Sequence, residues 1–210
     1  SMVVSIYGFP PVELVLFTLL GGTALAVSAN VLNQIFEIET DKLMARTSDR
    51  PLVTGTISVK NAYIYSIFLA LTGFIILFTQ TTPIAAYIAL MANIFYSFIY
   101  TLILKPRTNQ NIVIGGAAGA APVLIGWAAT GTELDTGSWL LFLLVFLWTP
   151  AHFWALSIEN VEDYRGAEFP MLPTQESKKR TSIFIGVYSC ATVITSLLIA
   201  PVLQLSLIHI

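Results

Sequence analysis

The stretch VELVLFTLLGGTALAVSANVLNQIFEIETD, residues 12–41, decides the fold class. Its first part, residues 12–32, contains a single charged residue. That part is long enough to cross a bilayer core, which takes about 20 apolar residues in a helix. Carboxylates follow directly after it, at residues 37, 39 and 41. We therefore expect a membrane-spanning helix that carries acidic side chains to one membrane surface.

The composition places the chain among integral membrane proteins. It is 56% hydrophobic and 10% charged, whereas a soluble domain carries about 25% charged residues. Apolar stretches of spanning length recur along the chain and predict an all-α, polytopic transmembrane helix bundle with about six spans. The predicted spans are residues 12–32, 61–79, 83–104, 111–130, 138–158 and 181–206. We interpret residues 1–210 as a single transmembrane domain.

The basic residues indicate how the chain is oriented in the membrane. All ten Lys and Arg residues fall in three segments, 33–60, 105–110 and 159–180, which alternate with pairs of spans. Because basic loops stay in the cytoplasm, these segments are expected there, with both termini on the other side of a bacterial or archaeal cell (inner) membrane. No basic patch resembles a nucleic-acid footprint, so the predicted environment is the lipid bilayer, with no nucleic-acid partner.

Asn33, Glu37 and Asp41 form the first candidate site. We expect the first span to continue through them without a break, and their i, i+4, i+8 spacing then places them on one helix face. Two carboxylates and an amide are hard oxygen donors of the kind that Mg²⁺ prefers. The alternative is a solvated helix end.

A second carboxylate pair, Glu159 and Asp163, follows the fifth span at the same i, i+4 spacing. If the two clusters face each other, they would hold Mg²⁺ ions that neutralise a diphosphate. Arginine and lysine near such a site bind diphosphate oxygens or the acidic groups of a second substrate. Four cations are candidates for this role: Arg46, Arg50, Lys105 and Arg107. The alternative for them is positive-inside anchoring.

Two features inside the spans also have alternative interpretations. His152 lies two helical turns before Glu159 on roughly the same face, and an ionisable residue at membrane depth is a candidate functional residue. A hydrogen-bonded structural histidine is the equally weighted alternative. Gly115 and Gly119 form a G-x-x-x-G face, which favours helix packing over close approach of the backbone to a substrate.

Several segments resemble the UbiA superfamily of intramembrane prenyltransferases, in particular its haem O synthase (protohaem IX farnesyltransferase) branch. The first resembling motif is Asn33, Glu37 and Asp41 followed by RTSDRPL at 46–52. The others are LKPRTNQNIVIGG at 104–116, GAAP at 119–122, GW at 126–127, HFWAL at 152–156, Glu159 with DYR at 163–165, and PMLP at 170–173. Glu37 stands where the family usually has Asp, and Pro106 separates a Lys-Arg pair that is usually adjacent.

The resemblance implies transfer of a farnesyl group from farnesyl diphosphate to a vinyl group of haem b, with Mg²⁺ as cofactor. It implies that the metal and diphosphate ligands are Asn33, Glu37, Asp41, Glu159 and Asp163. It implies substrate contacts from Arg46, Arg50, Lys105, Arg107, Asn111, His152 and Tyr164, the last two on the haem side. The family fold has about nine helices, against six spans here, so the domain is expected to be incomplete relative to the family.

Two other functions stay open at this point, and the doubled carboxylate pairs disfavour a third, that of a purely structural subunit. One is a UbiA-type transferase with an aromatic quinone-precursor acceptor, which the HFW and PMLP segments disfavour. The other is a small membrane transporter. A transporter would place polar residues at mid-membrane in several spans or show an inverted repeat, whereas the charges here gather at one interface. A homo-oligomer or a partner protein of the haem pathway is compatible with the sequence.

Overall fold

The computed structural model describes residues 1–203, and every regular element in that range is helical. The short helices are α1 (Met2–Ser5), α3 (Ile38–Asp41), α8 (Val161–Gly166) and α9 (Leu172–Gln175). The long ones are α2 (Val12–Phe36), α4 (Val59–Gln80), α5 (Pro83–Ile94) with the π-helix η1 (Phe95–Leu104), α6 (Asn111–Ala129), α7 (Thr136–Glu159) and α10 (Lys178–Val202). Among the described residues, six helices are long and apolar enough to cross a membrane, which confirms the predicted fold class.

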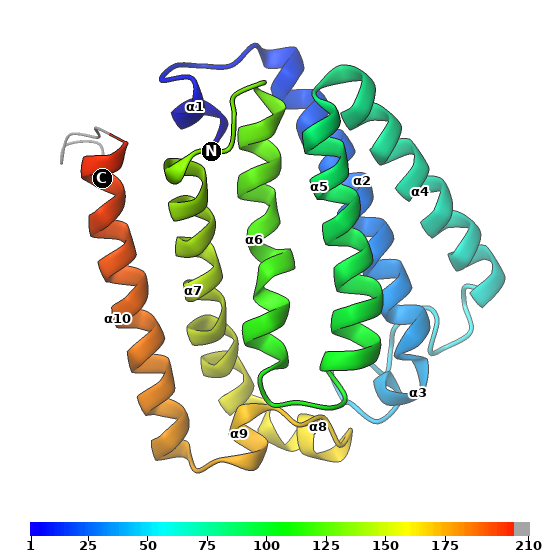
Figure 1. Cartoon of the computed structure of the whole chain (residues 1–210). Coiled ribbons are helices and arrows are strands. Elements are labelled where there is room, and N and C mark those ends of the chain that lie inside the picture. The colour runs from blue at the N-terminus through cyan, green and yellow to red at the C-terminus, as the bar shows by residue number, and fades with distance from the viewer. Residues whose placement is uncertain (204–210) are drawn as a thin grey trace.

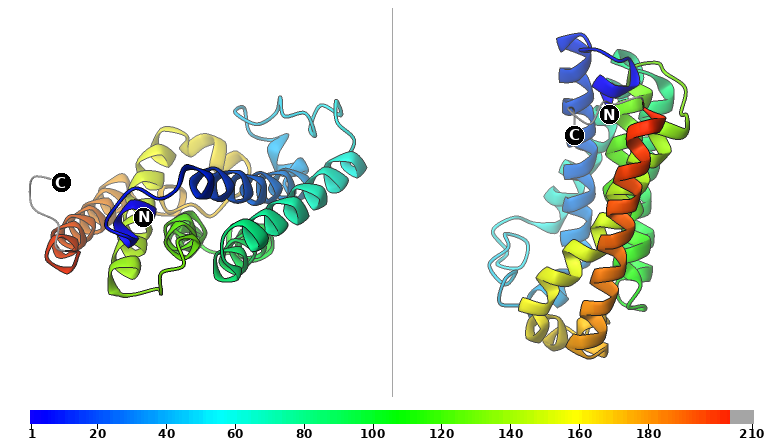
Figure 2. Two further views of the ribbon diagram at one scale, coloured as in Figure 1. Left: turned by 90° about the horizontal axis from the view of Figure 1, so that it is seen from above. Right: turned by 90° about the vertical axis from the view of Figure 1, so that its left-hand side faces the viewer.

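The spanning helices form a curved row. α10, α7, α6 and α5 stand side by side, and α4 follows α5 (Figure 1). α2 packs along α4 and also contacts α5 and η1, and it lies behind the row as seen in Figure 1 rather than in it (Figure 2). The short helices α3, α8 and α9 gather at one end of the bundle, at the bottom of Figure 1. The three basic segments therefore meet at this end, as the charge pattern predicts.

Four of the long helices begin at a side chain that caps their first turn. The side-chain oxygens of Ser58, Thr82, Asp135 and Ser177 each accept a hydrogen bond from the backbone N–H three residues on. Such caps satisfy N–H groups that the helix itself leaves free. Pro83 at the first position of α5 strengthens its start, because proline has no N–H to satisfy there.

α2 and α4 pack closely because small residues meet at their interface. A Cβ atom added to Gly73 would lie 2.7 Å from the carbonyl oxygen of Gly21, so only glycine fits at this crossing. Further along the same interface, the hydroxyls of Ser28 and Ser66 lie 3.1 Å apart and both are buried. Small residues and hydroxyl pairs of this kind hold helices together in lipid, where no hydrophobic force drives association.

The structure corrects two local predictions. The first span does not continue unbroken through residue 41: α2 ends at Phe36, and Glu37 leaves helical geometry with φ −105° and ψ 12° before α3 begins. The third span, expected as one helix over residues 83–104, changes from α-helix to π-helix at Phe95. The predicted sixth span runs to residue 206, and residues 204–210 lie outside the described part of the chain.

Candidate prenyl diphosphate site

A cavity of about 860 Å³ runs through the bundle between α2 and the row of helices. Small and apolar side chains from α2, α5, α6 and α7 line most of its length, among them Ala29, Ala92 and Gly119. At the end where the basic segments meet, the lining becomes polar and includes Asn33, Glu37, Asp41, Arg46, Arg50 and Lys105. One space therefore joins an apolar channel to a cluster of charges.

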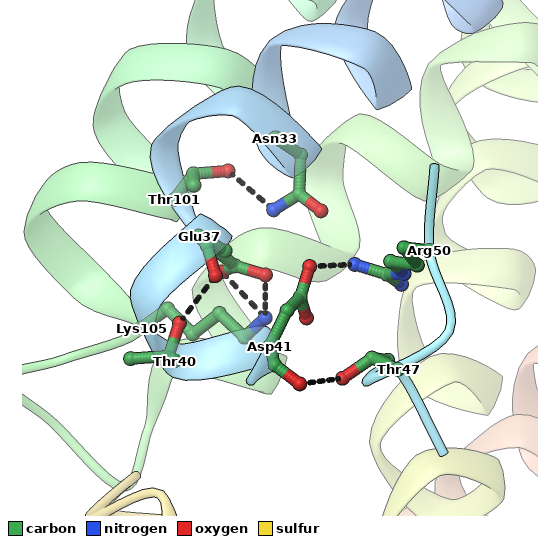
Figure 3. A network of polar contacts seen from close by, with 8 residues as sticks. All are labelled: Asn33, Glu37, Thr40, Asp41, Thr47, Arg50, Thr101 and Lys105. Carbon is green, nitrogen blue, oxygen red and sulfur yellow. Dashed lines mark hydrogen bonds and ion pairs between the residues drawn. The ribbon is translucent and has the colours of Figure 1, made fainter. Parts of the chain in front are cut away.

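Glu37 and Lys105 form a close ion pair at the polar end of the cavity. The Lys105 ammonium lies 2.6 Å and 2.7 Å from the two carboxylate oxygens of Glu37 (Figure 3). Both side chains are largely buried, and the Lys105 ammonium also lies 4.6 Å from the centre of the Phe169 ring. Two helices far apart in the sequence and the loop before α9 thus meet at one cation.

Asp41 is held by the segment that follows α3. Its Oδ2 accepts a hydrogen bond of 2.6 Å from Arg50, and its backbone carbonyl accepts one of 3.0 Å from Thr47 (Figure 3). Asp41 and Thr47 are buried, whereas Arg50 is partly open to the cavity. The two contacts fold residues 42–50 back over the end of α3, which places Arg50 beside the carboxylates.

The third member of the first cluster, Asn33, is oriented by the π-helix. Its Nδ2 donates to the Thr101 hydroxyl at 3.2 Å (Figure 3), and that hydroxyl donates to the carbonyl of Tyr96 at 2.9 Å. This side-chain bond reaches back five residues, and the backbone N–H of Lys105 bonds to the carbonyl of Tyr100 at the same five-residue spacing, which is that of a π-helix. π-helical segments are rare and frequently occur at functional sites.

The second carboxylate pair is not gathered with the first. Glu159 is exposed at the end of α7, Asp163 is half-buried in α8, and neither lines the cavity. Among residues 1–203, no three His, Cys, Asp or Glu side chains lie close enough together to hold one metal ion. The two-cluster arrangement thus stays a prediction.

The remaining predicted contacts divide between the cavity and its surroundings. Arg46 and Tyr164 line the cavity, whereas Arg107 is exposed and lies outside its lining. Pro106 stands between Lys105 and Arg107, so the two cations of this segment have different surroundings. Asn111 is fully buried, and its Nδ2 donates a hydrogen bond of 2.6 Å to the carbonyl of Thr108. Its side-chain oxygen has no hydrogen-bond partner among the described residues.

His152 is exposed on α7 and is absent from the cavity lining. Its ring stacks on Trp148 with centroids 4.4 Å apart and meets Phe153 edge-on. No hydrogen bond to His152 is found in residues 1–203, so its ring contacts are aromatic. The neighbouring Trp154 turns the other way, is fully buried and packs against Tyr188 of α10.

Sequence reasoning missed several polar residues of the site. Thr101 orients Asn33, and Asn30, Tyr96 and Tyr100 line the cavity. The signal for them was present, because each is a polar residue inside a predicted span, where such groups usually face a cavity or a neighbouring helix. Helical periodicity counted from Asn33 did not reveal them, since most lie on another helix.

The comparison with protein families decides the class of this protein. A profile of the UbiA prenyltransferase family matches residues 1–210. The chain belongs to the UbiA prenyltransferase family. The protoheme IX farnesyltransferase of Pseudarthrobacter chlorophenolicus is 45% identical over 96% of this UbiA-family chain and 63% of its own length. That of Trichormus variabilis is 44% identical over 95% of the chain and 63% of its own length. The chain thus spans less than two thirds of these relatives.

Solved structures of UbiA proteins share the fold. A digeranylgeranylglyceryl phosphate synthase has a TM-score of 0.77 over 97% of this chain and 70% of its own, at 22% identity. A UbiA homologue from Archaeoglobus fulgidus bound to GPP and Mg²⁺ has a TM-score of 0.73 over 90% of this chain and 66% of its own, at 21% identity. These likenesses confirm a helix bundle of the UbiA type.

The first cluster of this UbiA chain contains oxygen donors of the kind that magnesium ions bind. Glu37 and Asp41 supply carboxylate oxygens, and Asn33 donates through its nitrogen, which leaves its carbonyl oxygen for a ligand. All three are buried and line the same end of the cavity. Hard oxygen donors of this kind suit Mg²⁺, which keeps part of its coordination shell for water and phosphate oxygens.

Proposed function

We propose that this chain carries the prenyl-transferring site of a protohaem IX farnesyltransferase, which moves the farnesyl group of farnesyl diphosphate to a vinyl group of haem b. One observation carries the proposal: an apolar cavity of about 860 Å³ ends at a cluster of buried carboxylates and cations. A prenyl diphosphate has the same division, since an apolar chain ends in a charged group. The names of the relatives that are about 45% identical support haem b as the acceptor.

In this proposal the polar end binds the diphosphate. Asn33, Glu37 and Asp41 hold Mg²⁺, which when bound neutralises charge on the departing diphosphate. Lys105 and Arg50 contact these carboxylates directly, at 2.6 Å each. Both line the cavity and are placed to donate to the oxygens of a diphosphate bound at this end, as is Arg46. Charge-assisted hydrogen bonds from such groups stabilise the leaving group as the allylic C–O bond breaks.

The apolar part of the cavity has a separate task. It holds the farnesyl chain and keeps water away from the allylic carbocation that forms when the diphosphate leaves. The π electrons of the haem vinyl group then form the new C–C bond, and the positive charge moves onto the vinyl carbon next to the ring. A water molecule adds to that carbon and loses a proton, which gives the hydroxyethyl-farnesyl group of haem O.

Glu159, Asp163 and His152 are also part of the proposal, although none of them lines the cavity. Asp163 and Tyr164 are consecutive residues of α8, and Tyr164 already lines the cavity. Consecutive helical residues lie about 100° apart, so α8 would have to rotate by about a quarter turn to bring Asp163 to the same opening. His152 and Trp148 form an exposed aromatic surface on α7, to which a flat macrocycle can stack.

The same charge distribution supports an orientation in the membrane. We propose that the end with α3, α8 and α9 is cytoplasmic, because all basic residues lie in the segments that meet there. Farnesyl diphosphate, whose charged group does not cross a bilayer, would then reach the site from the cytoplasm. The farnesyl chain would lie among the helices within the membrane.

The test is a direct assay for the product. Membranes that contain the chain are incubated with haem b, farnesyl diphosphate and Mg²⁺, and haem O is sought by mass spectrometry. We expect haem O from the wild-type chain and none when Mg²⁺ is chelated. A prenylated aromatic acid formed in place of haem O would favour the quinone-precursor alternative, and no prenylated product from either acceptor would refute the proposal.

A further inference from the structure

The two glycines of the G-x-x-x-G face have different surroundings. A Cβ atom at Gly115 would collide with the ring of Tyr100, so glycine is required there for packing against η1. A Cβ atom at Gly119 would meet nothing within 4 Å, although Gly119 lies in the middle of α6. Both glycines line the cavity, but only at Gly119 is the space beside the backbone open. Packing explains the first glycine and leaves the second without a structural reason.

The open space at Gly119 belongs to the channel and lies at a defined depth. Gly119 is about 12 Å of helix above Asn111, at 1.5 Å rise per residue, measured from the charged end. Side chains on a helix lean toward its N-terminus, and the N-terminus of α6 is at that end. A larger residue at position 119 would therefore project into the channel and toward the carboxylates.

A second cavity-lining glycine with open space beside it lies farther from the charged end of the cavity. Gly22 on α2 also lines the cavity, and a Cβ atom there would meet nothing within 4 Å. It lies about 22 Å of helix above Glu37. The side chain of a larger residue at position 22 would lean away from the charged end, because α2 runs in the opposite direction to α6. Gly119 and Gly22 thus lie at two different depths of one channel.

We propose that Gly119 determines how long a prenyl chain the cavity accepts, with Gly22 acting on longer chains only. The inference rests on the proposed function, because it takes the diphosphate to lie at Glu37 and Asp41. A chain held at that end extends away from the charges and must pass Gly119 before it reaches Gly22. Glycine at position 119 keeps the channel open at the depth where the last isoprene unit of a farnesyl group would lie.

The experiment measures binding rather than turnover. The detergent-solubilised chain is titrated, with Mg²⁺ present, with the thio-diphosphate analogues of geranyl, farnesyl and geranylgeranyl diphosphate. We expect Gly119→Leu to weaken binding of the farnesyl and geranylgeranyl analogues about tenfold or more, since the added side chain overfills the channel. Binding of the two-unit geranyl analogue should change far less. Gly22→Leu should weaken binding of the geranylgeranyl analogue more than binding of the farnesyl analogue.

Matched variants separate this effect from general damage. Gly186 of α10 also has open space around a Cβ atom but lies outside the cavity lining, so Gly186→Leu should leave all three affinities unchanged. Gly119→Ala adds a methyl group that meets no neighbouring atom, so this variant should fold like the wild type. It should weaken binding less than Gly119→Leu does, with the same dependence on the length of the analogue. Gly115→Ala should lower thermal stability because it meets Tyr100.

The outcomes are distinct. Equal losses for all three analogues in Gly119→Leu, or no loss for any, would overturn the role of Gly119 while leaving the proposed function in place. If the wild-type chain binds none of the three analogues, the proposed function itself fails, and the inference fails with it. A loss of affinity that increases with the length of the prenyl chain supports both the role of Gly119 and the proposed function.

Discussion

At the scale of single residues, the charged end of the cavity combines groups that depend on one another. Glu37 and Asp41 are both buried, and each has one cation beside it, from a different part of the chain. A carboxylate at this depth is costly unless it is paired or binds a metal. Lys105 and Arg50 therefore stabilise the fold, and in the proposed reaction the same two cations serve the diphosphate.

The Lys105–Glu37 pair leads to a stability prediction. Lys105→Met should destabilise the chain by about 3–5 kcal/mol, because it leaves a buried carboxylate unpaired. The double variant Lys105→Met/Glu37→Gln should recover most of that loss. The exposed pair Lys42–Glu39 is the control, since its side chains are 45% and 83% exposed and Lys42→Met should change stability by about 1 kcal/mol at most. Thermal unfolding in detergent measures all three, and equal effects at the buried and exposed pairs would contradict the argument.

The carboxylates themselves lead to a prediction about metal. Glu37→Gln removes one charged donor from the first cluster, and Asp163→Asn removes one from the second. Each should abolish Mg²⁺-dependent turnover while leaving the helices folded, which circular dichroism would check. Glu39→Gln is the matched control, because Glu39 is exposed and lies outside the cavity lining. Near-normal turnover of Asp163→Asn at saturating Mg²⁺ would remove the second pair from the site.

At the scale of elements, the π-helix η1 turns three side chains of one segment toward the site. Thr101 contacts Asn33, Lys105 contacts Glu37, and Tyr100 packs over Gly115 and lines the cavity. The wider turn comes from backbone hydrogen bonds that span five residues, such as that from the N–H of Lys105 to the carbonyl of Tyr100. An ordinary α-helix over residues 95–104 would rotate these side chains relative to one another.

Two hydroxyls of η1 offer a matched comparison. Thr101→Val keeps the shape of the side chain but leaves the buried amide of Asn33 without its acceptor, so stability should fall by about 1–3 kcal/mol. Ser97, one turn earlier, is buried and its hydroxyl has no partner among the described residues. Ser97→Ala should therefore be neutral or stabilising. Thermal unfolding of both variants tests the contrast, and a comparable loss from Ser97→Ala would speak against this role for Thr101.

The exposed aromatic surface of α7 leads to a prediction about the acceptor. If His152 stacks on haem, His152→Ala should lower haem affinity about two- to tenfold, in line with about 0.5–1.5 kcal/mol for an aromatic pair. Binding of farnesyl diphosphate should stay nearly unchanged. Trp139, exposed at the other end of α7, is the control position. Titration of each ligand separately decides the matter, and equal losses for both ligands would assign His152 a structural role.

At the scale of the whole molecule, the row of helices separates two environments. The outer faces of α4 and α10 expose large apolar side chains such as Phe68, Ile75, Val187 and Leu197, which suit lipid. The inner face encloses the cavity, and its charged end coincides with the end where the basic segments meet. One arrangement thus provides both the membrane anchor and the candidate site.

The orientation leads to a labelling prediction. In a Cys190→Ser background, Ser48→Cys should resist a membrane-impermeant maleimide added to intact cells, because residue 48 lies in a basic segment. Glu133→Cys, in the loop at the other end of the bundle, should react readily. Both should react after the cells are opened. Labelling of position 48 from outside would reverse the proposed topology.

The sequence by itself determined the fold class, the six spans and the end at which the charges gather. These follow from span length and from the cost of burying charge in lipid, which are properties of each segment alone. Helical spacing and motif order also placed Asn33, Glu37, Asp41, Arg50 and Lys105 at one site. The same reasoning included Glu159, Asp163 and Arg107, which do not line the cavity. The resemblance carried by those motifs agrees with the family to which the chain belongs.

Only the tertiary structure decided which groups touch. The pairing of Glu37 with Lys105 joins residues that are far apart in the sequence. No periodicity of the sequence reveals the break in the helix at Glu37 or the π-helix that begins at Phe95. The same holds for Gly115 and Gly119, which are equivalent in a G-x-x-x-G pattern. Their difference depends on Tyr100, a residue of the neighbouring helix that fills the space beside one glycine and leaves the space beside the other open.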